Sequence, residues 1–201
     1  MAGSAIEFYF DFSSPYGYLG AKRIDAIAAE FGRFVLWRPI LLGVIFKATG
    51  QSPLVDQAIR GPYAKRDMER SARKLGVPFA FPEGFPFSSI YPCRVFYWLD
   101  SKSPEDAKVY ARTVYESAFA KGRAVADPET ALELAVALGH DRASVQAGMH
   151  DAAVKERLRA EVQSALDKGV FGSPFVIVDG EPFWGNDRLG EVREWLQTGG
   201  W

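Results

Sequence analysis

Cysteine is almost absent from this chain of 201 residues, which contains only Cys93. A single thiol cannot form an internal disulfide or a CxxC redox pair, and it cannot supply the ligand cluster of a zinc site. The two histidines, His140 and His150, have no cysteine or carboxylate at metal-ligand spacing, so we expect both to be structural. We therefore predict no metal site, and a lone thiol suits a reducing compartment.

An excess of charge of one sign and a long apolar run are also missing. The chain has 24 basic and 25 acidic residues, a net charge of −1, and no basic stripe. Nucleic acid and anionic membrane are therefore poor candidate partners. The most apolar stretch, residues 34–46, is interrupted by Arg38 and Pro39 and is too short to span a bilayer. The first seven residues lack the pattern of a signal peptide, and we expect a cytoplasmic protein.

Common nucleotide-binding and hydrolase motifs do not occur either. The sequence contains no P-loop, no GxGxxG and no GxSxG. Cys93 follows Pro92 in an apolar segment, where we expect it to pack rather than to act as a nucleophile. The chemistry of this chain must therefore depend on other residues.

The first forty residues read as strand, helix, strand. Residues 6–11 are apolar and aromatic, as in a buried strand. Pro15 is favourable in the first turn of a helix, which we expect to continue to about Gly32. Residues 34–38 predict a second strand. Such a unit places its two strands parallel to each other.

The rest of the chain is helical and then returns to β-structure. Residues 53–168 carry helix signals, including capped starts at Ser103 and Asp127, and no convincing strand. Residues 175–178 and 181–184 predict two strands joined by a tight turn, and a last helix is expected from about residue 187 to 197.

This order predicts an α/β thioredoxin fold with an all-helical domain inserted between an N-terminal βαβ unit and a C-terminal ββα unit. We place the thioredoxin-like domain at residues 1–52 and 166–201, and the insertion at residues 53–165.

Ser14 and Pro15 lie where the first strand passes into the first helix. A helix N-terminus carries about half a positive charge and free N–H groups, which lower the pKa of a thiolate placed there. A serine hydroxyl at that point can donate a further hydrogen bond to the thiolate. The alternative is that Ser13 or Ser14 merely caps the helix.

Ser173 and Pro174 precede the strand at residues 175–178. Proline after a small-residue turn is a candidate for a cis peptide bond. A cis bond would expose the backbone N–H and C=O of Ser173 to an extended peptide ligand. The alternative is an ordinary trans turn before a strand.

Taken together, these features resemble the 2-hydroxychromene-2-carboxylate isomerases and the kappa-class glutathione transferases of the thioredoxin superfamily. The resemblance runs nearly end to end. Its markers are residues 8–16 (FYFDFSSPY), 37–39 (WRP), 42–43 (LG), 46–50 (FKATG), 76–78 (GVP), 170–174 (VFGSP) and 183–189 (FWGNDRL).

The resemblance implies a glutathione site. The family's catalytic serine falls on Ser14, and the first cysteine of related oxidoreductases would stand there, so dithiol chemistry is excluded. The glutathione-binding residues implied are Ser14, Pro15, Tyr16, Gln51, Lys65, Ser173, Pro174, Trp184, Gly185, Asn186 and Asp187.

Three of these positions carry a specific expectation. The backbone of Ser173 resembles the group that pairs with the cysteinyl part of glutathione. Asp187 suits the α-ammonium of the γ-glutamyl part, and the helix-start N–H groups suit its α-carboxylate. Gln51 stands where kappa-class enzymes have an asparagine, which is a departure from the family pattern.

Lys47 and Phe85 are the candidates for contact with the second substrate. Lys47 falls near a lysine that resembles the carboxylate-binding group of the isomerases. Phe85 belongs to an aromatic segment that can line a pocket or fill the core. The Asn-Arg pair of the isomerases is not apparent between residues 53 and 61.

The resemblance implies a homodimeric enzyme that uses glutathione to interconvert 2-hydroxychromene-2-carboxylate and trans-o-hydroxybenzylidenepyruvate, or to act on a related aromatic compound. One alternative is a kappa-like transferase or peroxidase that consumes glutathione. Another is a thioredoxin-fold binding protein without catalysis.

Overall fold

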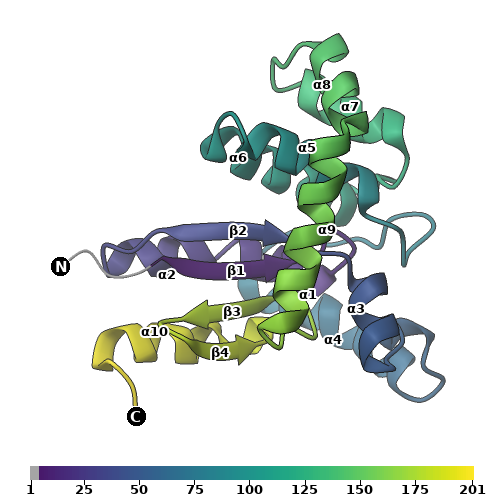
Figure 1. Cartoon of the computed structure of the whole chain (residues 1–201). Helices are drawn as coiled ribbons and strands as arrows, with labels where there is room; N and C mark the ends of the chain where they lie inside the picture. Colours follow the sequence, from purple (N-terminus) through teal and green to yellow (C-terminus); the bar gives the residue numbers. More distant parts are fainter. Residues whose placement is uncertain (1–4) are drawn as a thin grey trace.

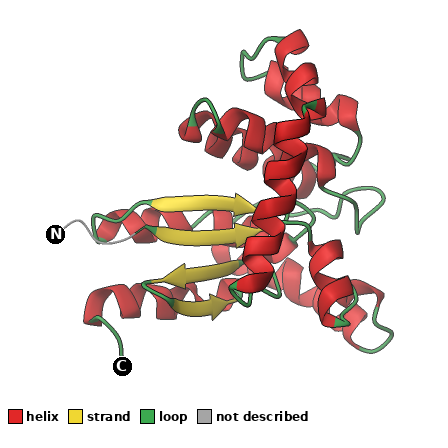
Figure 2. Cartoon of the chain, viewed as in Figure 1, coloured by secondary structure: helices red, strands yellow, loops and turns green. Residues whose placement is uncertain are grey.

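The computed structural model describes residues 5–201, in which four strands form one sheet in the order β2-β1-β3-β4. β1 pairs in parallel with β2 and antiparallel with β3, and β3 pairs antiparallel with β4. The α/β class and the parallel βαβ start are confirmed (Figures 1 and 2). The strands are β1 (Ile6–Phe10), β2 (Val35–Pro39), β3 (Phe175–Val178) and β4 (Glu181–Trp184).

The core of the sheet is aromatic. Phe8 and Phe10 stack with ring centroids 5.3 Å apart, and Trp37 packs edge-on against both. Apolar residues on both faces of β1 are buried because the strand is central and helices cover it. This burial sets the register that places residues 11–14 at the end of the sheet.

The single helix expected over residues 15–31 is wrong. The segment forms two helices, α1 (Pro15–Ala21) and α2 (Ile24–Glu30). Arg23 leaves the helical conformation between them, and its guanidinium donates a hydrogen bond to the carbonyl oxygen of Asn186 at 3.0 Å. The break therefore comes with a contact from a residue 163 positions away, which helical periodicity does not encode.

Between β2 and β3 every regular element of the described chain is helical. The helical character predicted for residues 53–168 is confirmed, whereas the helix at residues 42–49 was not expected. Several of these helices begin at positions that the sequence marks, such as the Ser103 and Asp127 N-caps. The elements are α3 (Leu42–Thr49), η1 (Leu54–Asp56), α4 (Arg60–Leu75), α5 (Ile90–Asp100), α6 (Pro104–Tyr115), a π-helical turn η2 (Glu116–Ala120), α7 (Pro128–Val136), α8 (Arg142–His150) and α9 (Ala152–Asp167).

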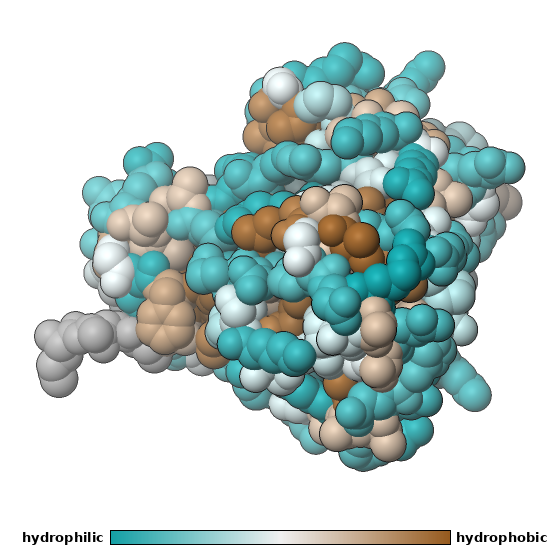
Figure 3. All heavy atoms as spheres, turned by 90° about the horizontal axis from the view of Figure 1, so that it is seen from above, coloured by the Kyte–Doolittle hydropathy of each residue, from teal (hydrophilic) through white to brown (hydrophobic). Residues whose placement is uncertain are grey.

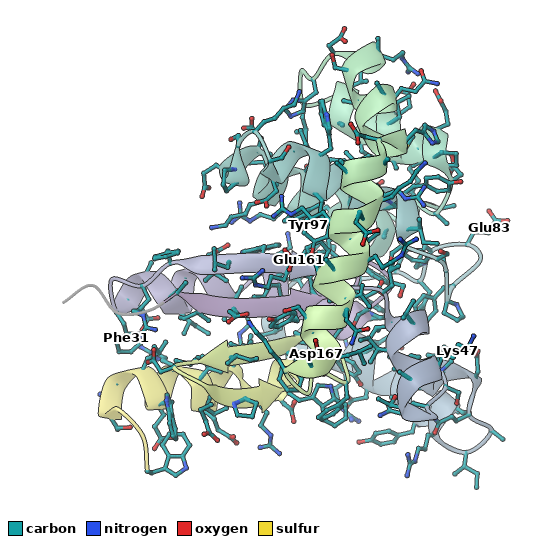
Figure 4. All side chains as sticks on the ribbon, viewed as in Figure 1. Phe31, Lys47, Glu83, Tyr97, Glu161 and Asp167 are labelled. Carbon is teal, nitrogen blue, oxygen red and sulfur yellow. The ribbon has the colours of Figure 1, made fainter. Side chains whose placement is uncertain are left out.

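This helical block is joined to the sheet by buried contacts. α9 runs from the block across the end of the sheet, and Glu161 on it pairs with Arg38 of β2 at 2.8 Å (Figures 1 and 4). The Tyr97 hydroxyl donates to the carbonyl oxygen of Pro39 at 2.7 Å. One buried apolar cluster includes residues of both parts. The expected boundary at residues 165 and 166 falls inside α9, and the division into two domains stays a prediction.

The C-terminal hairpin matches the prediction. Asp179 and Gly180 both have positive φ, 53° and 93°, as a tight two-residue hairpin turn requires. β4 is an edge strand, which suits Pro182 because proline has no N–H to donate. The last helix differs slightly from the expectation: a 3-10 turn, η3 (Asn186–Arg188), precedes α10 (Leu189–Thr198).

Seen from above, hydrophilic residues cover most of the visible face, and apolar residues gather in a few patches, the broadest near the middle of the view (Figure 3). No helix within residues 5–201 has the length and apolar character needed to cross a membrane.

Candidate functional site

Ser14 is the N-cap of α1. Its Oγ accepts a hydrogen bond from the backbone N–H of Gly17 at 3.0 Å, and Pro15 occupies the first helical position. The capping role that we gave as the alternative for Ser14 is therefore present. Ser14 is only 5% exposed, and its hydroxyl donates to the carbonyl oxygen of Ser173 at 2.9 Å. Capping and contact with the strand loop occur together, so neither excludes the other.

The peptide bond between Ser173 and Pro174 is cis, as predicted. Ser173 is 8% exposed, and β3 begins directly after this turn. Among residues 5–201, no hydrogen bond is made by the backbone N–H of Ser173. Its backbone thus presents an unpaired donor and a carbonyl oxygen next to Ser14.

A ring of hydrogen bonds supports these two serines. The Asp11 backbone N–H donates to Ser173 Oγ at 2.9 Å, and the Tyr115 hydroxyl donates to the Asp11 carbonyl oxygen at 2.9 Å. Tyr115 also has a hydrogen bond with the Ser173 side chain. A Cβ atom at Gly17 would come within 2.5 Å of the Tyr115 hydroxyl and 2.8 Å of Ser173 Oγ, so glycine is needed there.

The Asp11 carboxylate lies beneath the loop that carries Ser14. Its Oδ1 accepts the N–H of Ser13 at 2.7 Å and its Oδ2 accepts the N–H of Leu42, the first residue of α3, at 2.6 Å. Burial raises the pKa of Asp11, while these N–H groups and Ser89 oppose the rise. Asp11 therefore ties the start of α1 to the start of α3.

The segment of residues 184–187 lies beside Ser173. The Gly185 N–H donates to the Pro174 carbonyl oxygen at 3.0 Å. The Trp184 indole covers Gly172, where a Cβ would come within 2.2 Å of Nε1. Asn186 is buried and fixed by Arg23, whereas Asp187 is exposed. Four of the six buried polar or charged side chains in the described part, Asp11, Ser14, Ser173 and Asn186, thus occur in this region.

Tyr16, the second residue of α1, connects this helix to α4. Its hydroxyl donates to Asp67 at 2.7 Å. Burial raises the pKa of Tyr16, and the charges of Asp67 and Asp187 and the nearby Tyr63 raise it further. The charge of the exposed Asp187 thus acts on the Tyr16 hydroxyl.

Four predicted residues lie outside this arrangement. Gln51 follows the Gly50 C-cap of α3 and is exposed, and Lys47 is exposed on the last turn of α3 (Figure 4). Lys65 is two positions from Asp67 on α4, so the two side chains point to different sides of the helix. Phe85 packs against Phe119 and Phe81 in an aromatic cluster. No contact in the described chain brings these residues to Ser14.

Two hollows in the described chain lie away from Ser14 and Ser173. One hollow of ≈ 320 Å³ lies at the C-terminal end of α4, between Arg73 and Phe81, and another of ≈ 340 Å³ lies beside β2. Within residues 5–201, no group of three or more His, Cys, Asp or Glu side chains could hold a metal ion. The arrangement around Ser14 and Ser173 offers backbone hydrogen-bonding groups, which suit an extended ligand.

The sequence matches the DSBA-like thioredoxin domain model over residues 5–197. The chain belongs to this DSBA-like thioredoxin family. In place of a cysteine pair, this family member has Ser14 and Gly17 at the two ends of the tetrad that opens α1. Its Cys93 is buried in α5, so the described chain has no dithiol at the site.

Within this family, several proteins are similar over nearly the whole chain. A 2-hydroxychromene-2-carboxylate isomerase of Pseudomonas putida is 29% identical over 186 residues, which cover 92% of this chain and 90% of that protein. Glutathione S-transferase kappa 2 of Caenorhabditis elegans is 26% identical and covers 95% and 91%. The solved structure of a 2-hydroxychromene-2-carboxylate isomerase superposes with a TM-score of 0.83 at 28% identity, covering 96% and 95%. The resemblance inferred from the motifs is confirmed.

Sequence reasoning missed Asp11, Arg23, Asp67 and Tyr115. Asp11 lies inside the motif around Ser14, and its position between a strand and a capped helix could have identified it. Tyr115 and Asp67 lie in helices far along the chain with no local signal. Only the packing of α6 and α4 against α1 brings them to the site.

Proposed function

We propose that this protein is a glutathione-dependent isomerase that interconverts 2-hydroxychromene-2-carboxylate and trans-o-hydroxybenzylidenepyruvate, or acts on a related aromatic compound. The observation that carries the proposal is the juxtaposition of the Ser14 hydroxyl at a helix N-terminus with the backbone of Ser173. The similarity to isomerases and kappa transferases supports it.

The residues fit glutathione chemically. An extended peptide can pair with the free N–H and the carbonyl oxygen of Ser173, as a strand pairs with a sheet edge. Asp187 can accept the α-ammonium group of the γ-glutamyl part, and Trp184 can cover the backbone between them. In this proposal, the ligand's sulfur lies at Ser14, next to the positive end of α1.

Bound glutathione supplies a thiolate that adds reversibly to a conjugated double bond of the substrate. The former double bond is then a single bond about which the substrate can rotate, and departure of the thiolate restores the double bond in the other geometry. Ser14 and the N–H groups of α1 stabilise this thiolate, and the Ser173 backbone orients it. The thiol is returned at the end, so this reaction consumes no glutathione.

The test compares Ser14→Ala with Ser103→Ala. Both serines are N-caps, because Ser103 Oγ accepts the N–H of Asp106 at 3.2 Å, so Ser103→Ala should cost about 1 kcal/mol of unfolding free energy. Ser14→Ala should cost more, because it also leaves the buried Ser173 carbonyl oxygen without its donor. Only Ser14→Ala should lower kcat for isomerisation, by about tenfold or more if a hydrogen bond to the thiolate is lost. An isomerisation rate that survives Ser14→Ala would remove the proposed role of Ser14.

The rival functions give different products. The similarity to kappa-class transferases supports the alternative of a kappa-like transferase or peroxidase. Such an enzyme converts glutathione into a conjugate or a disulfide. Quantifying reduced glutathione after many turnovers decides between that reaction and isomerisation. A binding protein without catalysis would leave the thiol pKa of glutathione unchanged and would show no dependence of any rate on Ser14.

We also propose a homodimer located in the cytoplasm. The family resemblance supports the dimer, and a single cysteine that is buried supports a reducing compartment. Light scattering of the purified protein and fractionation of its native cells test the two statements.

A further inference from the structure

The Ser14 hydroxyl has a single proton, and that proton is already engaged. Its oxygen accepts the N–H of Gly17 at 3.0 Å, and its proton goes to the carbonyl oxygen of Ser173 at 2.9 Å. A hydroxyl group has one donor and two acceptor positions. In this arrangement Ser14 therefore has no proton left to donate to a ligand's sulfur.

The Ser173 carbonyl oxygen is held firmly where it meets Ser14. The Asp11 N–H fixes the Ser173 side chain at 2.9 Å, and Pro174 follows in a turn that the Gly185 N–H clamps at 3.0 Å. Ser14 is the only described hydrogen-bond donor to this carbonyl oxygen. If the hydroxyl turned away with nothing in its place, a buried acceptor would be left without a partner, which is costly.

An extended thiol peptide brings a second donor to the Ser173 carbonyl oxygen. We propose that the Ser173 carbonyl holds the Ser14 proton until the amide N–H of the ligand's cysteinyl residue replaces it, which frees the Ser14 hydroxyl to donate to the ligand's sulfur. The inference rests on the proposed function, since it concerns glutathione at the same site. The hydroxyl needs only to rotate about its Cβ–Oγ bond, while Gly17 keeps the oxygen in position.

The exchange couples recognition of the peptide to stabilisation of the thiolate. A thiolate is a stronger acceptor than a neutral carbonyl, so the released hydroxyl donates to it. A thiol without the amide N–H leaves the hydroxyl engaged with Ser173. Ser14 then lowers the thiol pKa of bound glutathione. It has little effect on the pKa of a bound thiol that lacks this N–H.

The experiment measures the thiol pKa of bound ligand from thiolate absorbance near 240 nm, without any second substrate. Two ligands are compared at saturation: glutathione and its depsipeptide analogue, in which an ester oxygen replaces the cysteinyl amide N–H. Wild type, Ser14→Ala and, as a capping control, Ser103→Ala are titrated with each. The geometry predicts that Ser14→Ala raises the pKa of bound glutathione by about one unit, a tenfold change in thiolate fraction, and that Ser103→Ala leaves it unchanged.

The thiol pKa of bound depsipeptide should differ by no more than about 0.3 units between wild type and Ser14→Ala. Equal sensitivity of both ligands to Ser14→Ala would overturn the exchange while leaving the proposed function intact. Failure of the depsipeptide to displace glutathione at a hundredfold excess would also overturn it, because the exchange has Ser14 keep the Ser173 carbonyl oxygen paired when the ligand lacks the N–H, so the ester should cost little affinity. Failure of glutathione itself to bind, or to show a lowered pKa, would instead sink the proposed function.

Discussion

The hydroxyl of Tyr115 lies 2.9 Å from the backbone carbonyl oxygen of Asp11, although 104 residues separate them. Tyr115 ends α6 in the helical block, and Asp11 directly follows β1 in the segment that leads to Ser14. The contact is fully buried and continues through Ser173. The helical block thus takes part in holding the Ser14 loop.

Tyr115→Phe removes this contact with little change in shape. The Asp11 carbonyl oxygen loses the Tyr115 donor but keeps the N–H of Ser14 at 2.9 Å, so we expect a loss of about 1 kcal/mol of unfolding free energy in urea denaturation. We also expect a lower isomerisation rate, because Ser173 loses its support. Tyr110→Phe is the matched control: its hydroxyl donates to the Ala131 carbonyl at 3.1 Å on the same helix, away from the site. Equal rates in the two variants would argue against a positioning role for Tyr115.

Gly172→Ala should weaken glutathione binding more than it weakens the fold. The new Cβ would come within 2.2 Å of Trp184 Nε1, and the indole, 54% exposed, can swing into solvent to relieve the clash. We expect Kd to rise about tenfold in calorimetry, because a covering aromatic contact is lost. Gly190→Ala on α10 meets no atom within 4 Å and serves as the control. An unchanged affinity of Gly172→Ala for glutathione would show that Trp184 does not contact the ligand.

Glu7→Gln should make the unfolding free energy less dependent on pH. Burial raises the pKa of Glu7, but hydrogen bonds with Lys168 and Tyr9 and the charge of Arg38 outweigh it, and the net pKa lies below the ordinary value of 4.5. The charged form is therefore favoured by folding, and its stabilisation is present above the unfolded pKa and fades as pH falls through the folded one. Solvent screens this group, so we expect a loss of about 1 kcal/mol at pH 7. At pH 3 the variant and the wild type should differ much less, and exposed Glu83→Gln should show no such change.

Much of the fold could be predicted because local signals agree with the global order. The aromatic strand at residues 6–10, the Ser103 and Asp127 caps and the turn at Asp179 and Gly180 are each visible in a few neighbouring residues. The break between α1 and α2 could not be predicted, since it occurs where Arg23 binds the distant Asn186.

The sequence alone determined the family and the chemical character of the site. It placed a serine at a helix start, a serine and a proline before a strand, and one cysteine too few for a redox pair. Spacing and resemblance then identified glutathione as the candidate ligand.

Only the tertiary structure decided which side chains meet. The proton of Ser14 is engaged by Ser173, Asp11 joins two helix starts, and Tyr115 reaches the loop from another part of the chain. The physical reason is that a hydrogen bond depends on ångström-scale placement of atoms, and packing across more than a hundred residues sets that placement. Sequence periodicity reports which face of an element is buried, and it does not report what lies against that face.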